Sequence, residues 1–296
     1  MDSISFPPEV LERIIPDLSL ERHIKSGIRP NYRNFQEFRN IEILKVISNE
    51  KLTTLYIKNG ITLIIATISY TINEIMNYTP NQFTSVYPSL SVSRGRTISG
   101  APTDEEMNLC QNLYETLLAN KFLPLDSLVF KPKLKVDDEF IDIDETDFSS
   151  NLHQFNLSIN FKVLGRSGPL FDILYYSLIE CLKNFKLPEI YMEDSIELRN
   201  QIFVNPVLTP VKLNIQNNPI SSNFGIYKLN DENFILCDLE NESEESNIIT
   251  KSSIISDGEN LLNFNFINGN LLDITKDDLI QMIKLSETRS KKLSTQ

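Results

Sequence analysis

The first candidate for chemistry is an arginine-bearing turn directly before a predicted helix. Gly165-Arg166-Ser167-Gly168 makes the turn, and Pro169 suits the first position of the helix. A helix N-terminus attracts anions, because its free backbone amides and its dipole favour negative charge. Arg166 could therefore bind an anion beside the helix start, although a solvent-facing turn arginine is the more common case.

A second candidate is an acidic run that could hold a metal ion. The segment from Asp137 to Asp147 has seven acidic residues, and Asp142-Ile-Asp144 begins like a calcium loop. It lacks the glycine of the sharp turn and the distal bidentate glutamate that such loops need. We expect an acidic loop here and no metal site.

Histidines and cysteines are too few and too far apart to make a catalytic or metal centre. The two histidines are His23 and His153, and the three cysteines are Cys110, Cys181 and Cys237. They form no CxxC pair, and no Cys-His or Ser-His-Asp arrangement follows from their spacing. We expect no catalytic residue, no metal, no cofactor and no disulfide framework, which favours a reducing compartment.

Composition limits how this chain can meet nucleic acid or a membrane. The 296 residues are 41% hydrophobic, enough for a sizeable core, and the formal net charge is −12. Phosphate contacts supply most nucleic-acid affinity, so RNA binding here must be local or shared with basic partners. No apolar stretch reaches the roughly 18 residues that span a bilayer, so we expect no membrane partner.

Strands dominate both halves of the predicted secondary structure. The alternation from Phe155 to Val163 is the cleanest strand signal, and Asn59-Gly60 between two apolar runs predicts a hairpin. Further strands are predicted at 41–43, 53–58, 61–69, 85–93, 211–215, 224–229, 234–239, 248–255 and 262–266.

Helices are predicted from capping residues and from apolar residues at helical spacing. Ser19 can cap a short helix that Gly27 ends, and Thr103-Asp-Glu-Glu106 is a capping box for a helix that should end near Lys121. Further helices are predicted from Pro169 to about Pro188 and behind Thr275. Strands followed by helices, twice over, predict an α+β protein of two halves.

Several segments in order resemble the RNase PH superfamily, and within it the ring subunits of the eukaryotic RNA exosome. They are Phe6-Pro-Pro-Glu-Val-Leu-Glu-Arg-Ile14, Leu18-Ser-Leu-Glu-Arg-His-Ile24, Gly27-Ile-Arg-Pro30, Glu37-Phe-Arg39, Ser85-Val-Tyr-Pro88, Arg94-Gly-Arg96, Thr103-Asp-Glu-Glu-Met107, Ser167-Gly-Pro-Leu-Phe-Asp172, Lys186-Leu-Pro188, Ser222-Asn-Phe-Gly-Ile226 and Asp238-Leu-Glu240. Each is weak alone, but the ordered set covers almost the whole chain.

The resemblance implies an RNase PH-like fold, also known as the ribosomal protein S5 domain 2-like fold. It implies an N-terminal helical arm at 1–36, a first half at 37–190, and a second half at 191–296 with a C-terminal helix. It also implies a heterodimer with a subunit of the ribosomal RNA-processing protein 46 type, beside one of the messenger RNA transport regulator type. A Csl4-type cap protein with an S1 domain would sit above, and RNA would thread the assembled channel.

By the same resemblance, the catalytic positions are degenerate. Active relatives have a pattern like Asp-Gly-Gly-Thr-Arg in the phosphate loop, where this chain reads Ser167-Gly168-Pro169-Leu170-Phe171. Leucine and phenylalanine cannot donate to phosphate, and proline has no amide hydrogen.

The family's acidic pair also looks incomplete. Asp238 remains, but its second member falls on Asn247 or Ile248, which cannot act as acids or ligate a metal through a carboxylate. Asp172 matches an aspartate of the inactive ring branch, where a structural role is expected. The remaining glutamates, Glu240 to Glu245, are expected to form a solvated loop.

Arg94 and Arg96 occupy a segment where active relatives bind RNA. They could contact the RNA backbone or, equally, lie at the surface or a subunit interface. With Arg166 they are the candidate RNA-binding residues.

These observations predict a non-catalytic ring subunit that supports 3′–5′ RNA processing and degradation, including rRNA maturation and mRNA turnover. The location implied is the nucleus, nucleolus and cytoplasm. Two alternatives stay open: a divergent phosphorolytic 3′–5′ exoribonuclease, and an unrelated acidic α+β protein that binds other proteins.

Overall fold

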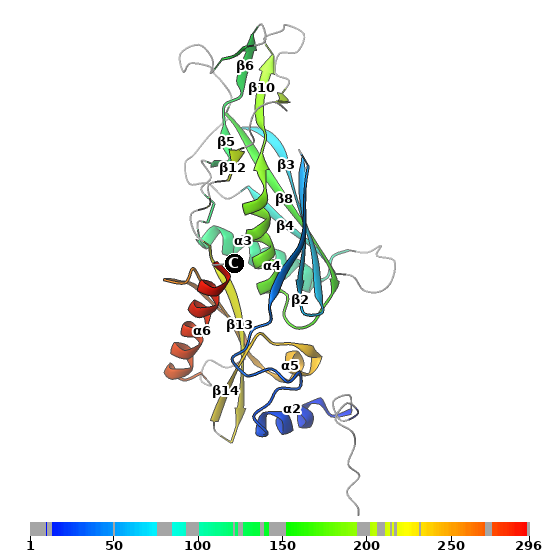
Figure 1. Cartoon of the computed structure of the whole chain (residues 1–296), viewed down its shortest axis with the longest axis vertical. Coiled ribbons are helices and arrows are strands. Elements are labelled where there is room, and N and C mark those ends of the chain that lie inside the picture. Colours follow the sequence, from blue (N-terminus) through cyan, green and yellow to red (C-terminus); the bar gives the residue numbers. More distant parts are fainter. Residues whose placement is uncertain are drawn as a thin grey trace, which may run out of the picture.

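The structure is a computed structural model of the chain. It describes residues 10, 14–49, 51–75, 85–92, 101–120, 122–123, 127–136, 139–141, 152–193, 202–205, 211–213, 215, 218–230, 232–269 and 274–294. The molecule is elongated, with β6 near one end and α2 near the other (Figure 1). No helix in these ranges is long and apolar enough to cross a membrane.

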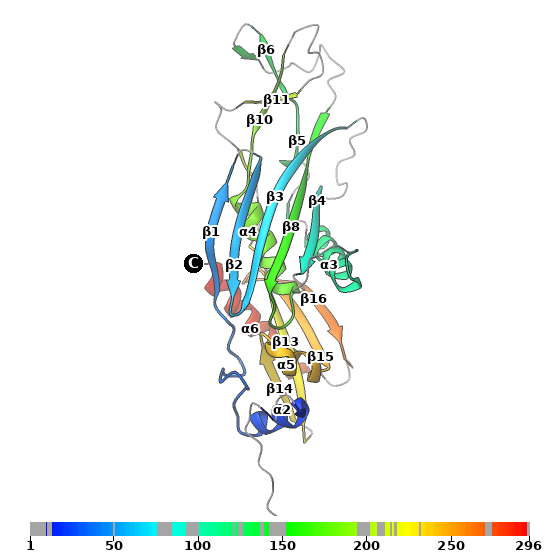
Figure 2. The same ribbon diagram turned by 90° about the vertical axis from the view of Figure 1, so that its right-hand side faces the viewer.

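The first sheet forms the body of the molecule and has the strand order β1-β2-β3-β8-β4 (Figure 2). Its strands are β1 (Ile41–Ser48), β2 (Leu52–Asn59), β3 (Thr62–Ile75), β4 (Val86–Val92) and β8 (Leu152–Gly165), and β5 (Val129–Phe130) pairs with the end of β8. β4 runs parallel to β8, and the other pairs are antiparallel. The predicted hairpin is confirmed: Asn59 pairs with Thr62, and Gly60 takes a φ of +61° in the turn.

The second sheet lies below the first in Figure 1 and has the order β14-β13-β15-β16. Its strands are β13 (Ile220–Leu229), β14 (Glu232–Cys237), β15 (Thr250–Ser256) and β16 (Leu261–Asn268). β13 and β14 form a hairpin, with Leu229 paired to Glu232. The long helix α6 (Lys276–Ser294) packs against β13 and β15.

Smaller strands extend the molecule beyond the first sheet. They are β6 (Lys133–Val136), β7 (Glu139–Ile141), β9 (Lys186–Leu187), β10 (Glu189–Glu193), β11 (Ile202–Asn205) and β12 (Val211–Lys212). β7 lies inside the acidic run that we predicted to be a loop, and the rest of that run is outside the described residues. The predicted boundary at 190/191 falls within β10, and the division into an arm and two halves stays a prediction.

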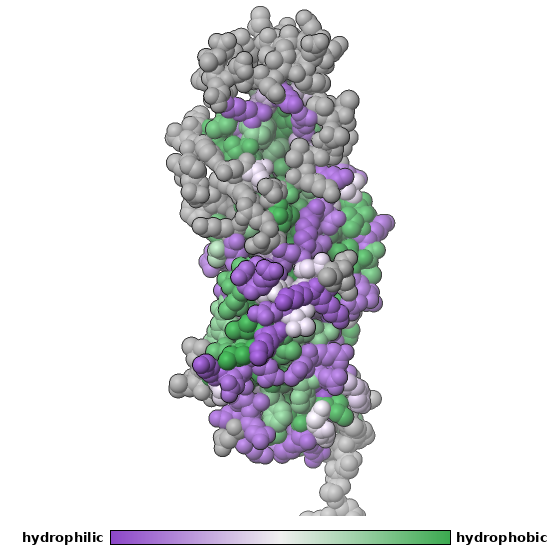
Figure 3. All heavy atoms as spheres, turned by 60° about the vertical axis from the view of Figure 1, so that its left-hand side comes forward, coloured by the Kyte–Doolittle hydropathy of each residue, from purple (hydrophilic) through white to green (hydrophobic). Residues whose placement is uncertain are grey.

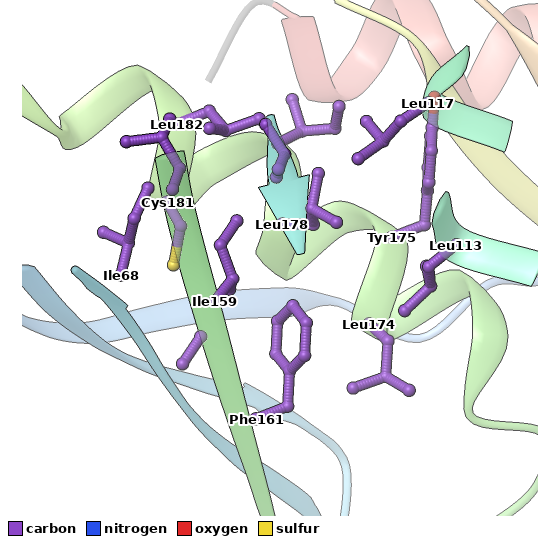
Figure 4. Packing of buried hydrophobic residues seen from close by; sticks show 14 of the residues in the cluster. Ile68, Leu113, Leu117, Ile159, Phe161, Leu174, Tyr175, Leu178, Cys181 and Leu182 are labelled. Atoms are coloured by element: carbon purple, nitrogen blue, oxygen red, sulfur yellow. The ribbon is translucent and has the colours of Figure 1, made fainter. Parts of the chain in front are cut away.

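The main core fills the space between the first sheet and the helices α3 (Asp104–Asn120) and α4 (Phe171–Asn184) (Figure 4). The alternation of β8 sends Phe155, Leu157, Ile159, Phe161 and Val163 to one face, and all five are buried. α4 is apolar nearly all round because it is buried between the first sheet and β13.

Helix starts were predicted correctly where a capping box marks them. The Thr103 amide donates to Glu106 Oε2 at 2.7 Å, and the Glu106 amide donates to Thr103 Oγ1 at 3.3 Å. Thr275 and Asp278 form the same reciprocal pair ahead of α6, at 3.0 and 3.2 Å. These local contacts satisfy amides that the first helical turn leaves free.

Two other helix starts were predicted wrongly. α2 (Pro16–Lys25) begins at Pro16, so Ser19 is inside the helix rather than its cap. Proline fits this first position because its missing amide hydrogen is not needed there. α4 begins at Phe171 with Leu170 as its N-cap, so Pro169 precedes the helix.

Candidate functional site

The candidate site lies where the degenerate phosphate loop, residues 167–171, meets an acidic segment, residues 238–247. The loop connects β8 to α4, and the acidic segment connects β14 to β15 through the short helix α5 (Asn241–Asn247). Figure 2 shows α5 below the end of β8 and above α2. The two segments come from the first and second sheets, so tertiary folding alone brings them together.

Polar groups of Ser167 are used within the chain. The Ser167 amide donates to Thr62 Oγ1 at 3.0 Å, and the Asn241 amide donates to Ser167 Oγ at 3.3 Å. The Ser167 carbonyl accepts from Arg39 Nη1 at 3.1 Å. An entering phosphate would have to displace these contacts.

Gly168 allows the loop and the acidic segment to touch. Its φ is +81°, in the left-handed region that favours glycine. A Cβ atom at this position would lie 2.1 Å from the Leu239 carbonyl oxygen. No other residue type therefore fits here without moving one of the two backbones.

The last two residues of the loop have apolar side chains that are buried. The Leu170 and Phe171 side chains are only 2% and 7% exposed and belong to the main core. The Phe171 ring stacks on Tyr175, with centroids 6.0 Å apart. Leu170 is the N-cap of α4 and makes no side-chain hydrogen bond to the helix amides. The residues that align with phosphate-binding positions thus pack inward.

Asp238 is the best-held carboxylate of the site. Its two oxygens accept from Arg39 Nη2 at 2.7 Å and Arg39 Nε at 2.8 Å, and one also accepts from the Arg39 amide at 2.8 Å. Arg33 lies 3.4 Å away. Burial would raise the pKa of Asp238, but the hydrogen bonds and charge of Arg39 and the charge of Arg289 outweigh it and lower the pKa to about 2. The carboxylate is therefore ionised and cannot supply a proton near neutral pH.

Glu244 is fully buried with Arg29. Arg29 Nε and Nη2 donate to the two Glu244 oxygens at 2.9 and 2.5 Å, and both side chains are 0% exposed. Arg29 also donates to the carbonyls of Cys237 and Asp238 at 2.6 and 3.0 Å. This is a bidentate pair whose remaining donors are satisfied, as a buried charge requires.

The expectation of a solvated glutamate loop is therefore wrong. Glu240 contacts Arg33 at 3.0 Å and Arg39 at 3.5 Å, and Glu244 is inside the protein. The reason is the segment from Arg29 to Arg39, whose arginines lie about 200 positions earlier in the chain and neutralise the acids. The sequence motifs Gly27-Ile-Arg-Pro30 and Glu37-Phe-Arg39 contain two of the arginines that form these ion pairs. Nothing in the sequence, however, indicates which carboxylates they bind.

Arg166, the candidate anion ligand, is held between two carboxylates. It reaches Glu105 at 2.8 Å and Glu245 at 2.7 Å, and its side chain is about one-third exposed. Hydrogen bonds and charge from both partners outweigh partial burial and raise its pKa. Arg94 and Arg96 lie outside the described residues, so their part as RNA contacts stays a prediction.

Asp172 joins α4 to the second sheet. It is buried and accepts hydrogen bonds from Ser221 and, at 2.8 Å, from Ser253. Burial raises its pKa, although Ser221 and the charge of Arg289 oppose the shift. These serines belong to β13 and β15, so the carboxylate links the start of α4 to the second sheet. In the described part of the chain, no group of three His, Cys, Asp or Glu side chains is placed to hold a metal ion.

Comparison with known proteins gives matches in sequence and in structure. No family model matches the chain. It is 24% identical over 216 residues to the Schizosaccharomyces pombe protein named exosome complex component rrp43, covering 72% of each chain. It superposes on a chain of the Archaeoglobus fulgidus exosome with RNA bound to the active site, with a TM-score of 0.68, 17% identity and coverage of 97% and 98%. A chain of an archaeal exosome core gives a TM-score of 0.65 at 15% identity, with the same coverage.

The fold is thus the predicted α+β fold of RNase PH-like exosome chains. The sequence match to rrp43 agrees with the resemblance that the ordered motifs indicate.

Replacing Arg29 should be costly, because it would leave Glu244 buried without its partner. We expect Arg29→Met to lower the free energy of unfolding by roughly 3–5 kcal/mol. The matched control is Lys25→Met, which removes an exposed pair with Glu21 and should cost under about 1 kcal/mol. Urea unfolding of the three proteins measures both values, and equal losses would contradict a special role for the buried pair.

Acid should weaken the site through Asp238. Because its pKa is lowered in the folded protein from 3.8 to about 2, its contribution is present above about pH 4 and is lost as pH falls through 2. We expect the stability advantage of the wild type over Asp238→Asn to shrink by about 2 kcal/mol between pH 5 and pH 2. Denaturation at both pH values tests this. Equal losses of stability in the two proteins between these pH values would contradict the prediction.

Proposed function

We propose that the chain is a non-catalytic subunit of the RNA exosome core ring. It forms the RNA channel together with other RNase PH-like subunits and so supports 3′–5′ processing and degradation of RNA, including rRNA maturation and mRNA turnover. The observation that carries the proposal is the loop at 167–171, whose Leu170 and Phe171 are core residues and whose Ser167 is already hydrogen-bonded within the chain. The Leu170 and Phe171 side chains offer an orthophosphate no donor there, and the Ser167 amide already donates to Thr62.

The electrostatics of the acidic segment support the same conclusion. A phosphorolytic site needs acids that can manage a proton or a metal at the scissile bond. Here Asp238 and Glu244 are neutralised by arginines of the same chain. The carboxylates hold the arm in place and are not free to serve a substrate.

A divergent phosphorolytic exoribonuclease is the second candidate. It is favoured by the superposition on a chain from an archaeal exosome with RNA bound to the active site. At 17% identity that likeness concerns the fold, and the chemistry depends on the residues just described.

The remaining parts of the proposal concern the partner subunits, the cellular location and the residues that contact RNA. We propose a heterodimer with the ribosomal RNA-processing protein 46 type, a neighbour of the messenger RNA transport regulator type, a Csl4-type cap, and residence in nucleus, nucleolus and cytoplasm. Arg94 and Arg96 are proposed RNA contacts. Arg166 could join them only if RNA phosphate displaced Glu105 and Glu245.

The absence of phosphorolysis can be tested directly. The purified chain, incubated with RNA and inorganic phosphate, should release no nucleoside diphosphate above a no-protein blank, because no phosphate is bound. A phosphorolytic RNase PH enzyme serves as positive control. Phosphate-dependent release that disappears in Arg166→Ala would assign the activity to this chain and overturn the proposal.

Ring membership predicts a defined set of companions. Native purification of the tagged full chain should recover RNase PH-like subunits and an S1-domain cap protein in equal amounts, measured by mass spectrometry. An untagged strain provides the background. Companions that include neither ring nor cap proteins would instead support the acidic protein-binding alternative.

A further inference from the structure

A cavity lies between α3 and the second sheet. It has a volume of about 530 Å³ and is lined by one side of α3, by Phe171 at the start of α4, and by residues of β15 and β16. Figure 2 shows α3 directly above β16. Sites for small molecules have volumes of roughly 300–1,000 Å³ and often lie between packed units of a protein. The size and place of this cavity therefore suit a small molecule.

The α3 wall of the cavity is one face of the helix. Asn112, Thr116 and Ala119 line it at spacings of four and three residues, which bring side chains together on a helix. Glu115 lines it as well and is exposed. Gln111 donates to one Glu115 oxygen at 2.7 Å, and the other oxygen has no partner among the described residues. One carboxylate oxygen is thus available to a ligand.

The opposite wall is the face of the second sheet that lies towards α4. Asn263 pairs with Ile255 of β15, and Asn265 pairs with Ser253. Residues directly opposite each other on neighbouring strands share a face of the sheet. Ile255 belongs to the main core, and Ser253 donates to Asp172 of α4 at 2.8 Å. The two asparagine side chains therefore lie on the face that borders the cavity.

Three side-chain amides around the cavity are unused. In the described part of the chain, the amides of Asn112, Asn263 and Asn265 make no hydrogen bond to another protein group. Each amide offers two donors and one acceptor oxygen. The lining contains the Glu115 carboxylate and, among the described residues, no basic side chain. These groups suit a ligand that has both donors and acceptors and that is not an anion.

Apolar groups complete the lining of the cavity. Phe171 lies at its base, Leu109 is half-buried, and Ile267 is 51% exposed. Hydrophobic residues also lie among hydrophilic ones on the face in Figure 3, so a mixed surface alone does not mark a site. The cavity differs because it is walled on two sides and contains unused amides. A flat heterocycle can contact apolar groups with its faces while its edge makes hydrogen bonds.

We propose that this cavity binds a neutral heterocycle with an exocyclic amino group, namely adenine, cytosine or guanine as the free base or nucleoside. Amides of Asn263 and Asn265 bond to the edge of the ring, and the available oxygen of Glu115 accepts from its amino group, pairings that the same side chains make with bases in nucleic acids. Uracil has no amino group and lacks the second contact. Every group belongs to this chain, so the proposal goes beyond the proposed function and does not depend on it.

Calorimetric titration of the full chain tests the ligand class. Adenosine and cytidine should bind roughly fivefold or more tightly than uridine, because uridine cannot donate to Glu115. Adenosine 5′-monophosphate should bind more weakly than adenosine, because its phosphate carries the same sign of charge as the carboxylate. Absence of binding by adenosine at millimolar concentration would overturn the proposal. Equal affinity for adenosine and uridine, or tighter binding of the monophosphate, would overturn it as well.

Substitutions in α3 locate the site. Glu115→Gln should weaken adenosine binding roughly fivefold or more, and Ala119→Trp should abolish it by filling the cavity. The matched control is Asp104→Asn, which removes an exposed carboxylate from the same helix outside the cavity and should bind adenosine normally. Both cavity positions are exposed, and circular dichroism checks that each variant is folded. Undiminished binding by the folded Ala119→Trp protein would place the ligand elsewhere and contradict the proposal.

Discussion

Arginines between residues 29 and 39 and carboxylates after β14 neutralise each other inside the protein. Arg39 holds Asp238 through both oxygens, and Arg29 holds Glu244 with neither side chain exposed to water. Transferring such charges from water costs several kcal/mol for each ion, which only a complete set of partners offsets. The segment from Arg29 to Arg39 and the acidic segment that contains α5 therefore have to fold together, because either one alone would leave a buried charge unpaired.

The same network fixes the candidate site. Arg39 reaches across to the Ser167 carbonyl at 3.1 Å, and Gly168 brings its backbone against the Leu239 carbonyl. A loop tied at two points cannot open for an anion without breaking contacts to the acidic segment. Leu170 and Phe171 then complete the closure from the core side. In this way a network that is remote in sequence decides what the loop can bind.

Local sequence patterns predicted most of the helices and strands. They could not predict ion pairs between residues that are far apart in the sequence. The alternation of β8 and the capping boxes at Thr103 and Thr275 depend on neighbours within a few residues, so the sequence contains the whole pattern. Arg29 and Glu244 are 215 positions apart, and no local pattern states that they meet. The loop at 167–171 was predictable as a degenerate phosphate site only through family resemblance. Its burial required the fold.

Most arginines of the described residues already contact groups of the same chain, which limits how the chain can bind RNA. Five of the six arginines in the described residues contact carboxylates or backbone carbonyls of the chain itself, and they are Arg29, Arg33, Arg39, Arg166 and Arg289. With a net charge of −12, little positive field remains for phosphate. In the proposed ring, the chain would contribute to the RNA channel through its shape, and much of the cationic lining would have to come from its neighbours. Under that proposal, its contacts with those neighbours matter more than the loop at 167–171.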